Sequence, residues 1–403
     1  MIISVYGIPR SGKDTFINQI IKNKERAYHL QGSKTLNELA CQKYDSKFRQ
    51  LTAKQQKEIR ILFTEYAKDL DKRYDLVIVD GHYAFPKANG YQSVFTEADL
   101  NLYDAFFYLK RSSEEIVRNF NNGDKHDYSE HLLSKEKVDE WIDYEIGNMQ
   151  PIVESQDKDF IVLDSDARSV DFLCQFSKTS KEISREIADE IIFMAKGKNI
   201  VLTDLDKTVS INDLTDDFIE FSKIDPTFPK KVFNGDYYTR YQFYLFHNEL
   251  GKAHNYDEAV NYALKKIVIN QSVVSDLLAL KKDGCVIALT TGMKDVWTEK
   301  NKDLQAFDGI FGFDGREQLI ITPLIKRLVA KYLASSHEII AIGDSVIDLG
   351  MLLAATKGYL VSMIKLDRRI IAQYDKGNIN QTLMQPKYSK FKYDFVKEEE
   401  IKW

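Results

Sequence analysis

One stretch decides the fold of the second half of the chain: Val201-Leu202-Thr203-Asp204-Leu205-Asp206-Lys207-Thr208-Val209. The apolar run from Asn199 to Leu202 predicts a short buried strand, and two aspartates follow its end. Side chains alternate along an extended chain, so both carboxylates point toward one pocket. Because hard divalent cations prefer oxygen ligands, and because a carboxylate can act as nucleophile, acid or base, the stretch indicates Mg²⁺ and phosphate chemistry. The alternative is a strand end that carries two solvated acids.

Three more polar positions follow apolar elements downstream. A core strand, Cys285 to Leu289, ends in Thr290-Thr291-Gly292, and Thr322 to Lys326 opens a helix. A last strand, Ile339 to Ile342, ends in Gly343-Asp344-Ser345-Val346-Ile347-Asp348.

A long insertion, about 210–278, separates the aspartates from the second strand. Its helical patterns predict an inserted helical cap. The cap contains an aromatic cluster, Tyr237 to His247, which either stacks on a base or forms the core of the cap. Arg240 within this cluster is a candidate for substrate recognition.

In their order along the chain, the four pieces resemble the motifs of the haloacid dehalogenase (HAD) superfamily. The place of the cap is similar to that in the phosphoserine-phosphatase-like branch, and the resemblance covers about Lys198 to Tyr374. It implies a Rossmann-like domain with an inserted helical cap. It also implies that Asp204 attacks phosphorus and forms an aspartyl-phosphate, while Asp206 protonates the leaving oxygen and then activates water.

The same resemblance implies a Mg²⁺ site. Asp344 would hold the ion together with Asp204 and the main-chain carbonyl of Asp206, and Asp348 would support the site. The cation charge is needed because an anionic nucleophile attacks an anionic phosphate. An acid at Asp206 favours a phosphatase over a dehalogenase or a simple mutase.

Two of the implied roles have rival residues. Thr291 fits the hydroxyl position best by spacing, with Thr290 as the alternative. Lys326 is the better candidate for the helix lysine, and Lys331 is the weaker one. Both groups would neutralise the phosphoryl oxygens.

The first half of the chain opens with a phosphate-binding motif. A first strand ends in Gly7-Ile8-Pro9-Arg10-Ser11-Gly12-Lys13-Asp14-Thr15, and an amphipathic helix follows. Gly7 and Gly12 let backbone N–H groups surround a phosphate, and the helix N-terminus adds positive potential. Lys13 would reach the β/γ-phosphates of ATP. Asp14 takes the place of the usual hydroxyl, so the neighbouring Thr15 is the candidate that touches Mg²⁺.

Further strands follow the phosphate-binding motif. Leu76 to Asp80 ends in an acid, which is either the second Mg²⁺-side group of a P-loop enzyme or a helix cap. Ala105 to Leu109 leads to Arg111 and to a helix with Arg118, and these arginines either neutralise a transferred phosphate or lie on a solvated face. Phe160 to Asp164 supplies a last strand, and the alternation predicts a doubly wound parallel sheet of the α/β class.

This half resembles the nucleoside monophosphate kinases over about Met1 to Leu163, especially archaeal-type adenylate kinase. The resemblance is carried by the glycine motif, by Lys47-Phe48-Arg49-Gln50-Leu51, and by Val79-Asp80-Gly81-His82 with Gly90-Tyr91. Its Arg-Ser-Gly-Lys-Asp-Thr run is also similar to phage deoxynucleoside monophosphate kinases. By this resemblance Arg49 would hold the acceptor's phosphate, and Ser33 and His82 would line the acceptor side. His82 alternatively is a structural histidine on a turn.

Composition excludes several other classes of protein. The chain has 403 residues, enough for two or three domains, with 44% apolar and 29% charged residues. Its net charge of -5 argues against a strongly basic nucleic-acid surface. The cysteines Cys41, Cys174 and Cys285 are widely spaced, and no apolar run approaches the roughly 20 residues of a membrane span. We therefore expect a cytoplasmic protein with no membrane partner.

We expect four segments along the chain: a P-loop kinase-like domain at 1–176, a connector helix at 177–198, a HAD phosphatase domain at 199–375, and a C-terminal tail at 376–403. The connector places Ile183, Ile187 and Ile191 on one face. The tail either docks or is a loose end.

Three functions are compatible with these features. The first is a bifunctional enzyme, an ATP-dependent nucleotide-type kinase joined to a Mg²⁺-dependent phosphomonoesterase, with ATP and nucleotide-like phosphate esters as partners. The second is a polynucleotide 5′-kinase/3′-phosphatase, which the module order resembles; the absence of an obvious basic stretch and the size of the cap disfavour nucleic acid. The third is a phosphatase regulated by a P-loop domain that only senses nucleotide, which the intact Lys13 and Asp80 disfavour.

Overall fold

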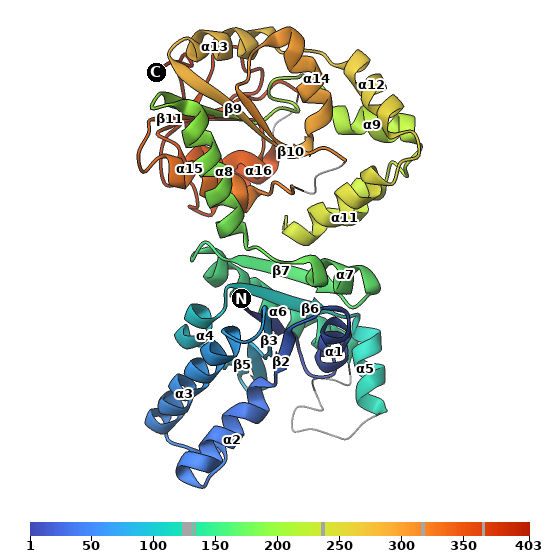
Figure 1. Cartoon of the computed structure of the whole chain (residues 1–403), viewed down its shortest axis with the longest axis vertical. Helices are drawn as coiled ribbons and strands as arrows, with labels where there is room; N and C mark the ends of the chain where they lie inside the picture. The colour runs from blue at the N-terminus through green and yellow to red at the C-terminus, as the bar shows by residue number, and fades with distance from the viewer. Residues whose placement is uncertain (123–130, 132–133, 235–237, 316–318, 365–366) are drawn as a thin grey trace. The chain divides into compact units, whose positions relative to one another are not determined.

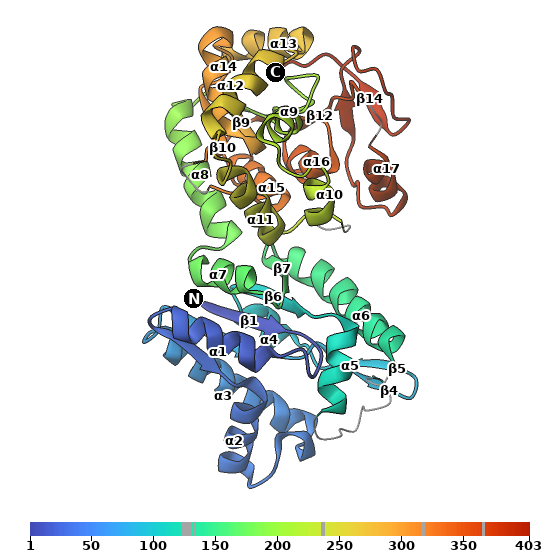
Figure 2. The same cartoon turned by 90° about the vertical axis from the view of Figure 1, so that its right-hand side faces the viewer.

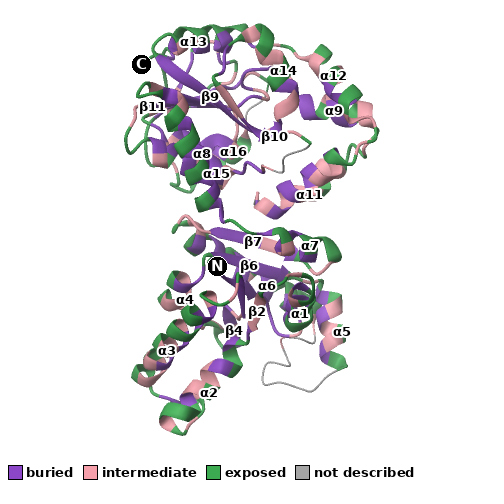
Figure 3. Cartoon of the chain, in the orientation of Figure 1, coloured by how far each residue is buried: buried purple, intermediate pink, exposed green. Residues whose placement is uncertain are grey.

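The computed structural model describes residues 1–122, 131, 134–234, 238–315, 319–364 and 367–403. The chain falls into two compact units, Met1–Thr179 and Ser180–Trp403, each built around a parallel sheet whose central strands are buried (Figures 1 and 3). No helix in the described parts of the chain combines the length and the apolar character that crossing a bilayer requires.

The first unit has a sheet with the strand order β2-β3-β1-β6-β7, and every neighbouring pair is parallel. β1, which is apolar except for Ser4, is buried along its whole length, as expected for a strand in a sheet covered on both faces. The doubly wound parallel sheet predicted for this half is therefore confirmed. Its strands are β1 (Ile2–Tyr6), β2 (Ala27–Leu30), β3 (Leu76–Asp80), β6 (Ala105–Lys110) and β7 (Asp159–Asp164). Its helices are α1 (Lys13–Asn23), α2 (Gly32–Tyr44), α3 (Ala53–Asp71), α4 (Glu97–Leu102), α5 (Ser113–Asn121), α6 (Lys135–Glu154) and α7 (Ala167–Gln175).

A small antiparallel hairpin, β4 (Ala84–Lys87) and β5 (Gly90–Ser93), is tied to α6 (Figure 2). The buried Glu145 of α6 accepts hydrogen bonds from the backbone N–H of Ala84 at 2.9 Å and from the hydroxyl of Tyr108 at 2.8 Å. Trp141 of the same helix donates to the Ala84 carbonyl at 3.2 Å. Burial raises the pKa of Glu145 to about 7.

The second unit has a sheet with the order β10-β9-β8-β11-β12-β13-β14, again parallel at every pair. The strands are β8 (Asn199–Thr203), β9 (Gly284–Met293), β10 (Gly309–Phe313), β11 (Ile339–Gly343), β12 (Lys357–Leu360), β13 (Leu383–Gln385) and β14 (Val396–Glu398). The helices outside the cap are α8 (Ser180–Ala195), α13 (Gln271–Lys281), α14 (Lys294–Leu304), α15 (Pro323–Leu333), α16 (Val346–Ala354) and α17 (Arg368–Asp375). Because β8 lies between β9 and β11, the carboxyl ends of the three motif-bearing strands meet at one edge.

The inserted cap leaves the core after β8 and returns before α13. Its helices are α9 (Leu214–Ser222), α10 (Phe228–Val232), α11 (Arg240–Gly251) and α12 (Tyr256–Lys266). The two ends of the insertion pair as an antiparallel bridge between Ser210 and Ile269, and the N–H of Ile211 donates to the carbonyl of Val268 at 2.7 Å. The insertion therefore ends near Ile269, earlier than the expected 278, because α13 packs on β9 as part of the core.

The segment expected as a connector belongs to the second unit. α8 begins at Ser180, the first residue of that unit, and buries Ile183, Ile187 and Ile191 in a core that it shares with α15. The helix has the buried face that its periodicity indicates, and the division between the units falls before the helix, after Thr179.

The C-terminal segment is not a loose end. β13 and β14 extend the sheet beyond β12 (Figure 2). The indole of Trp403 donates to the Leu280 carbonyl at 3.3 Å and covers Gly284, where a Cβ atom would lie 2.2 Å from the Trp403 ring. Tyr388 donates to Asp276 at 2.8 Å. These contacts make the tail part of the core on the α13 side of the sheet.

Candidate active site

The first motif sits on the loop that leaves β8. The N–H of Asp204 donates to the carbonyl of Ile342 in β11 at 2.9 Å, which continues the pairing of the two strands. The chain then turns sharply: Lys207 has a positive φ of 63°, and the N–H of Thr208 donates to the carbonyl of Leu205 at 3.2 Å. This turn brings Thr208 back toward the motif, and its hydroxyl donates to Asp344 at 3.4 Å.

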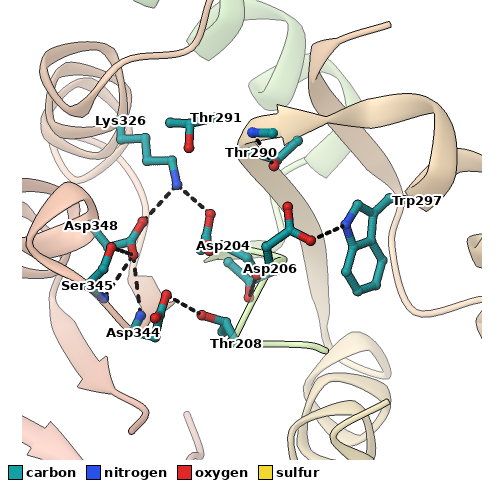
Figure 4. A network of polar contacts seen from close by, with 12 residues as sticks. Asp204, Asp206, Thr208, Thr290, Thr291, Trp297, Lys326, Asp344, Ser345 and Asp348 are labelled. Atoms are coloured by element: carbon teal, nitrogen blue, oxygen red, sulfur yellow. Dashed lines mark hydrogen bonds and ion pairs between the residues drawn. The ribbon is translucent and has the colours of Figure 1, made fainter. Parts of the chain in front are cut away.

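A fully buried lysine connects the first and last motifs. The Nζ of Lys326 lies 2.6 Å from Asp204 Oδ1 and 2.7 Å from Asp348 Oδ1 (Figure 4). α15 presents this lysine because Thr322 caps the helix, accepting from the N–H of Ile325 at 3.2 Å. Asp204 and Asp348 hold the pKa of Lys326 above its usual value although burial opposes this, so the lysine is charged.

Both carboxylate oxygens of Asp348 are engaged in bonds to neighbouring groups of the protein. While one of its oxygens faces Lys326, the other accepts from the N–H groups of Asp344 and Ser345 at 3.3 and 3.2 Å and from the Ser345 hydroxyl at 3.0 Å. Gly343 is required beside it, since a Cβ atom there would lie 2.5 Å from the Asp348 Cβ. Asp348 therefore orients the loop and the lysine, and leaves Asp204 and Asp344 as the carboxylates available to a ligand.

The donor set fits a hard divalent cation. Asp204, Asp344 and Asp348 each offer an oxygen, and these atoms lie within 4.8 Å of one another. Burial, followed by the neighbouring carboxylates, raises the pKa of Asp204 to about 7 and that of Asp344 well above its usual range. Lys326 neutralises part of the charge of these three carboxylates, and Lys207, which pairs with Asp213, also lowers the pKa of Asp344. Mg²⁺ would neutralise the remaining negative charge with the oxygen ligands it prefers. Asp204 and Asp344 would hold the ion.

Asp206 has a different environment from Asp204. Its carboxyl accepts from the N–H of Leu214 and from the indole Nε1 of Trp297, both at 3.3 Å (Figure 4). Burial, then the charges of Asp213 and Asp204, raises its pKa well above the usual value, so this carboxyl tends to keep a proton. Its side chain lies outside the three-carboxylate cluster, so a metal contact from this residue would involve the main chain, as the HAD resemblance implies.

The hydroxyl motif lies in a β-bulge. β9 and β10 pair regularly up to Leu289 and Phe311 and again at Met293 and Phe313, so three residues of β9 oppose Gly312 alone. Within the bulge the Thr290 hydroxyl is buried and accepts from the N–H of Gly292 at 3.0 Å. Figure 4 shows the hydroxyl of Thr291 pointing toward the ammonium of Lys326.

The two rival positions are thereby separated geometrically. Thr290 is engaged within the strand, whereas Thr291 faces the lysine. Lys331 lies exposed in the last turn of α15, whereas Lys326 is buried against Asp204. Arg240 opens α11 in the cap and is half-buried; its contact with a substrate remains a prediction.

The phosphate-binding loop of the first unit lies between β1 and α1. Gly12 has a φ of 85°, and a Cβ atom there would lie 3.4 Å from the guanidinium of Arg111. The ammonium of Lys13 turns back on the loop, donating to the carbonyls of Gly7 at 2.6 Å and Ile8 at 3.2 Å. Burial lowers the pKa of Lys13 to about 8, against the raising effect of neighbouring acids.

Asp80 at the end of β3 faces this loop in a cluster with Asp14 and His29, whose ligand atoms lie within 4.8 Å of one another. His29 lies 3.2 Å from Asp80 Oδ1, and the N–H of Gly32 donates to the same oxygen at 2.9 Å. These bonds lower the pKa of Asp80 although its burial opposes the shift. The structure thus brings Asp14 to Asp80. Thr15 is exposed, and its contact with Mg²⁺ stays a prediction.

The predicted acceptor-side residues are only partly brought together. The guanidinium of Arg49 lies 5.6 Å from the ring centre of Phe85, and the ring of His82 lies 5.1 Å from the same ring. Burial and then the charge of Lys13 lower the pKa of His82 well below its usual value. Ser33 is exposed at the start of α2. Arg118 is an exposed residue of α5 that pairs with its helix neighbour Glu115 at 3.7 Å, in agreement with the solvated alternative.

One comparison with known proteins matches part of the first unit. A family model described as an AAA domain matches residues 6–133, a range that includes the phosphate-binding loop. No curated protein sequence matches the chain.

Several solved structures are similar to it. One is a phospho-aspartyl intermediate analogue of phosphoserine phosphatase, with 19% identity and a TM-score of 0.32 over 44% of this chain and 98% of that one. A HAD family hydrolase from Salmonella enterica subsp. enterica serovar Typhi has 15% identity and a TM-score of 0.35 over 47% and 73%. The Pnkp1/Rnl/Hen1 RNA repair complex has 14% identity and a TM-score of 0.25 over 87% and 91%. With TM-scores this low, none of these structures is used to assign a role to the chain.

Two residues at this site are not marked individually by the sequence. Trp297 of α14 donates to Asp206, and His247 of the cap helix α11 contacts the backbone of Thr291. Both look like ordinary apolar-face residues of helices. Only the approach of those helices to the loops after β8 and β9 gives them a place at the site.

Proposed function

We propose that the second unit is a Mg²⁺-dependent phosphomonoesterase that works through an aspartyl-phosphate on Asp204 and takes nucleotide-like phosphate esters. The observation that carries the proposal is the contact of Asp204 with the fully buried Lys326, beside Asp344. Asp206, two residues from Asp204, is in an environment that favours its protonated form. One carboxylate is thus paired with a cation and the other retains a proton, which is the division of roles that a nucleophile and an acid require.

The reaction follows from these two environments. The Asp204 carboxylate attacks phosphorus while Asp206 gives its proton to the leaving oxygen, so the ester bond breaks and an acyl phosphate forms. The ammonium of Lys326 and the hydroxyl of Thr291 neutralise the phosphoryl oxygens. Asp206, now a carboxylate, takes a proton from water, and that water displaces phosphate from Asp204. Mg²⁺, when bound, would reduce the repulsion between the anionic nucleophile and the anionic phosphate.

A phosphatase screen of variants tests this proposal. Substrates are p-nitrophenyl phosphate, mononucleotides, sugar phosphates and 3′-phosphorylated oligonucleotides, all with Mg²⁺. Asp204→Asn should abolish hydrolysis, and Lys326→Ala should lower kcat about 10²- to 10³-fold, as the loss of a transition-state cation does. Lys331→Ala, on the same helix but exposed, should stay within about twofold of wild type. Hydrolysis that survives in Asp204→Asn would refute the covalent mechanism, and a marked preference for the oligonucleotides would favour the end-repair alternative.

We further propose that the first unit is an ATP-dependent kinase for a nucleotide-type acceptor. Support comes from Lys13 in the glycine loop, the guanidinium of Arg111 beside Gly12, and Asp80 facing the loop. Arg49 and His82, which flank Phe85, would receive the acceptor.

ADP formation with a panel of nucleoside monophosphates and 5′-hydroxyl oligonucleotides tests the kinase. Lys13→Ala should abolish it, while Lys22→Ala, an exposed lysine of the same helix α1, should not. Asp204→Asn should leave ADP formation intact, and loss of both activities in that variant would refute two independent sites. No ADP with any acceptor, together with a phosphatase rate that responds to ATP, would favour the sensor alternative.

A further inference from the structure

A histidine of the cap is fixed to the core strand that carries the hydroxyl motif. The Nε2 of His247 in α11 lies 2.9 Å from the carbonyl oxygen of Thr291. The imidazole is 2% exposed and stacks on Phe313 of β10, with ring centres 4.5 Å apart and planes 7° from parallel. The cap thus touches the core at the residue whose hydroxyl faces Lys326.

The direction of this hydrogen bond is determined by its partner. A carbonyl oxygen only accepts, so Nε2 carries the hydrogen and donates. Burial lowers the pKa of His247 to about 4, so the ring is neutral in ordinary buffers and Nδ1 is left as an acceptor. Among the described residues no donor lies within hydrogen-bond distance of Nδ1. The contact with Thr291 is therefore the polar interaction for which this buried imidazole is oriented.

The strand segment that receives the bond is irregular. Thr290 to Gly292 lie in the bulge of β9, where the regular pairing with β10 is interrupted. Gly312 of β10 allows the close approach, because a Cβ atom there would lie 2.6 Å from the Thr290 Cγ2. The bulge has an internal bond from the N–H of Gly292 to the Thr290 hydroxyl, and His247 supplies a bond from the cap side. A segment outside the regular ladder depends on such bonds for its conformation.

We propose that His247 is a positioning residue: from the cap it holds the bulge of β9, and so sets the Thr291 hydroxyl only while α11 is seated on the core. This inference rests on the proposed phosphatase function of the same site. When the cap closes, Thr291 and Lys326 would come into place together to bind the phosphate. The reason is that the bond from His247 of the cap ends on the backbone of Thr291. Chemistry in the open form would then lack one of its two neutralising groups.

Two substitutions separate the donor from the ring. His247→Phe keeps an aromatic ring against Phe313 but leaves the Thr291 carbonyl without its donor. His247→Gln removes the ring but retains an N–H donor at a similar distance along the side chain. His254→Phe, an exposed histidine of the same cap, is the matched control.

Steady-state kinetics with p-nitrophenyl phosphate and Mg²⁺ give the first readout. We expect kcat/KM to fall about 10- to 100-fold in His247→Phe, since leaving a buried carbonyl unpaired displaces it, and to recover to within about threefold of wild type in His247→Gln. His254→Phe should match wild type. If His247→Phe keeps kcat/KM within about twofold, or if His247→Gln is as impaired as His247→Phe, the proposal is wrong and His247 only packs the cap.

Amide hydrogen exchange of the metal-free full chain gives a readout that needs no activity. The N–H groups of Gly292 and Met293 should exchange faster in His247→Phe than in wild type, and His247→Gln should restore their protection. Equal protection in all variants would overturn the proposal. If no phosphate ester is hydrolysed by wild type, the proposed function fails, and the exchange data still decide whether His247 holds the bulge.

Discussion

Asp344→Asn is expected to stabilise the metal-free protein while it abolishes phosphatase activity. Asp344 is the half-buried member of a group of three carboxylates whose charge Lys326 and Lys207 offset only in part, so the folded state carries unfavourable charge that the metal ion would relieve. Asparagine keeps the shape of the side chain and removes the charge. A residue that the proposed chemistry requires is thus predicted to lower the stability of the protein without its metal.

The magnitude follows from the separation of the carboxylates. Oxygens of Asp204 and Asp344 lie within 4.8 Å of each other. Two unit charges at that distance repel by about 3.5 kcal/mol at an effective dielectric constant of about 20. Lys207 and Lys326 offset part of this repulsion, so we expect Asp344→Asn to raise the free energy of unfolding by about 1–3 kcal/mol at pH 8.

The gain should depend on pH in a definite direction. Burial, then Asp348 and Asp204, raises the pKa of Asp344 in the folded state well above its usual value. Above pH about 4 the unfolded chain loses the proton that the folded state keeps, so this residue costs wild type progressively more stability as pH rises toward the folded pKa. The difference between Asp344→Asn and wild type should therefore be small at pH 4 and large at pH 8.

Differential scanning calorimetry of the full chain in EDTA measures this, through the transition of the second unit. For a unit of this size about 1 kcal/mol corresponds to about 2–4 °C in Tm. Mg²⁺ should raise the Tm of wild type and leave Asp344→Asn nearly unchanged. Asp303→Asn, whose parent carboxylate is 76% exposed on α14, serves as the control and should change little. An Asp344→Asn protein that is less stable than wild type at pH 8, or a gain that does not shrink toward pH 4, would refute the reasoning.

Three further predictions concern the surroundings of the site. Trp297→Phe removes the indole donor to Asp206 and should raise the pKa of that carboxyl further. In a pH–rate profile the alkaline limb of kcat should then move to higher pH, and a limb that stays in place contradicts the prediction. Gly312→Ala forces a Cβ atom against Thr290 and should lower the free energy of unfolding, measured by thermal unfolding, by about 1–3 kcal/mol, with a parallel loss of kcat/KM. Gly147→Ala is the control and should not lower it, because a Cβ atom there meets nothing within 4 Å. Trp403→Ala should lower the stability of the second unit by about 2 kcal/mol, because the half-buried indole covers Gly284 and bonds to the Leu280 carbonyl; unchanged unfolding would mean that the C-terminal segment does not contribute.

The sequence was most informative where an apolar run ends in a polar motif. β8 is buried except for its first residue, and β11 is buried throughout. The local runs of apolar residues predict both strands and their positions. The order of the motifs along the chain predicted that Asp204, Lys326 and Asp344 would meet, and the parallel pairing of β8 with its neighbours is the physical reason that they do.

Features that depend on contacts between distant elements could not be predicted. The bulge of β9 reflects close packing against Gly312, and no local pattern in Thr290-Thr291-Gly292 distinguishes it from a regular strand end. β14 is only three residues long and is formed because a neighbouring edge is available. The sequence predicts Asp14 as a residue of the nucleotide-binding loop but does not predict its proximity to His29, which arises from the pairing of β2 with β3 rather than from the motif.

The antiparallel bridge between Ser210 and Ile269 has a consequence for how this chain can change over time. The two ends of the insertion lie within hydrogen-bond distance of each other. The cap therefore leaves and re-enters the core at neighbouring points, as a tight turn would. The entropic cost of a longer or shorter excursion between two such neighbouring points grows only slowly with its length. The intervening helices can therefore change in length without altering the register of β8 or β9, provided that contacts such as that of His247 with Thr291 are kept. Residues of the cap that do not touch the core are then free to vary while the core loops stay the same.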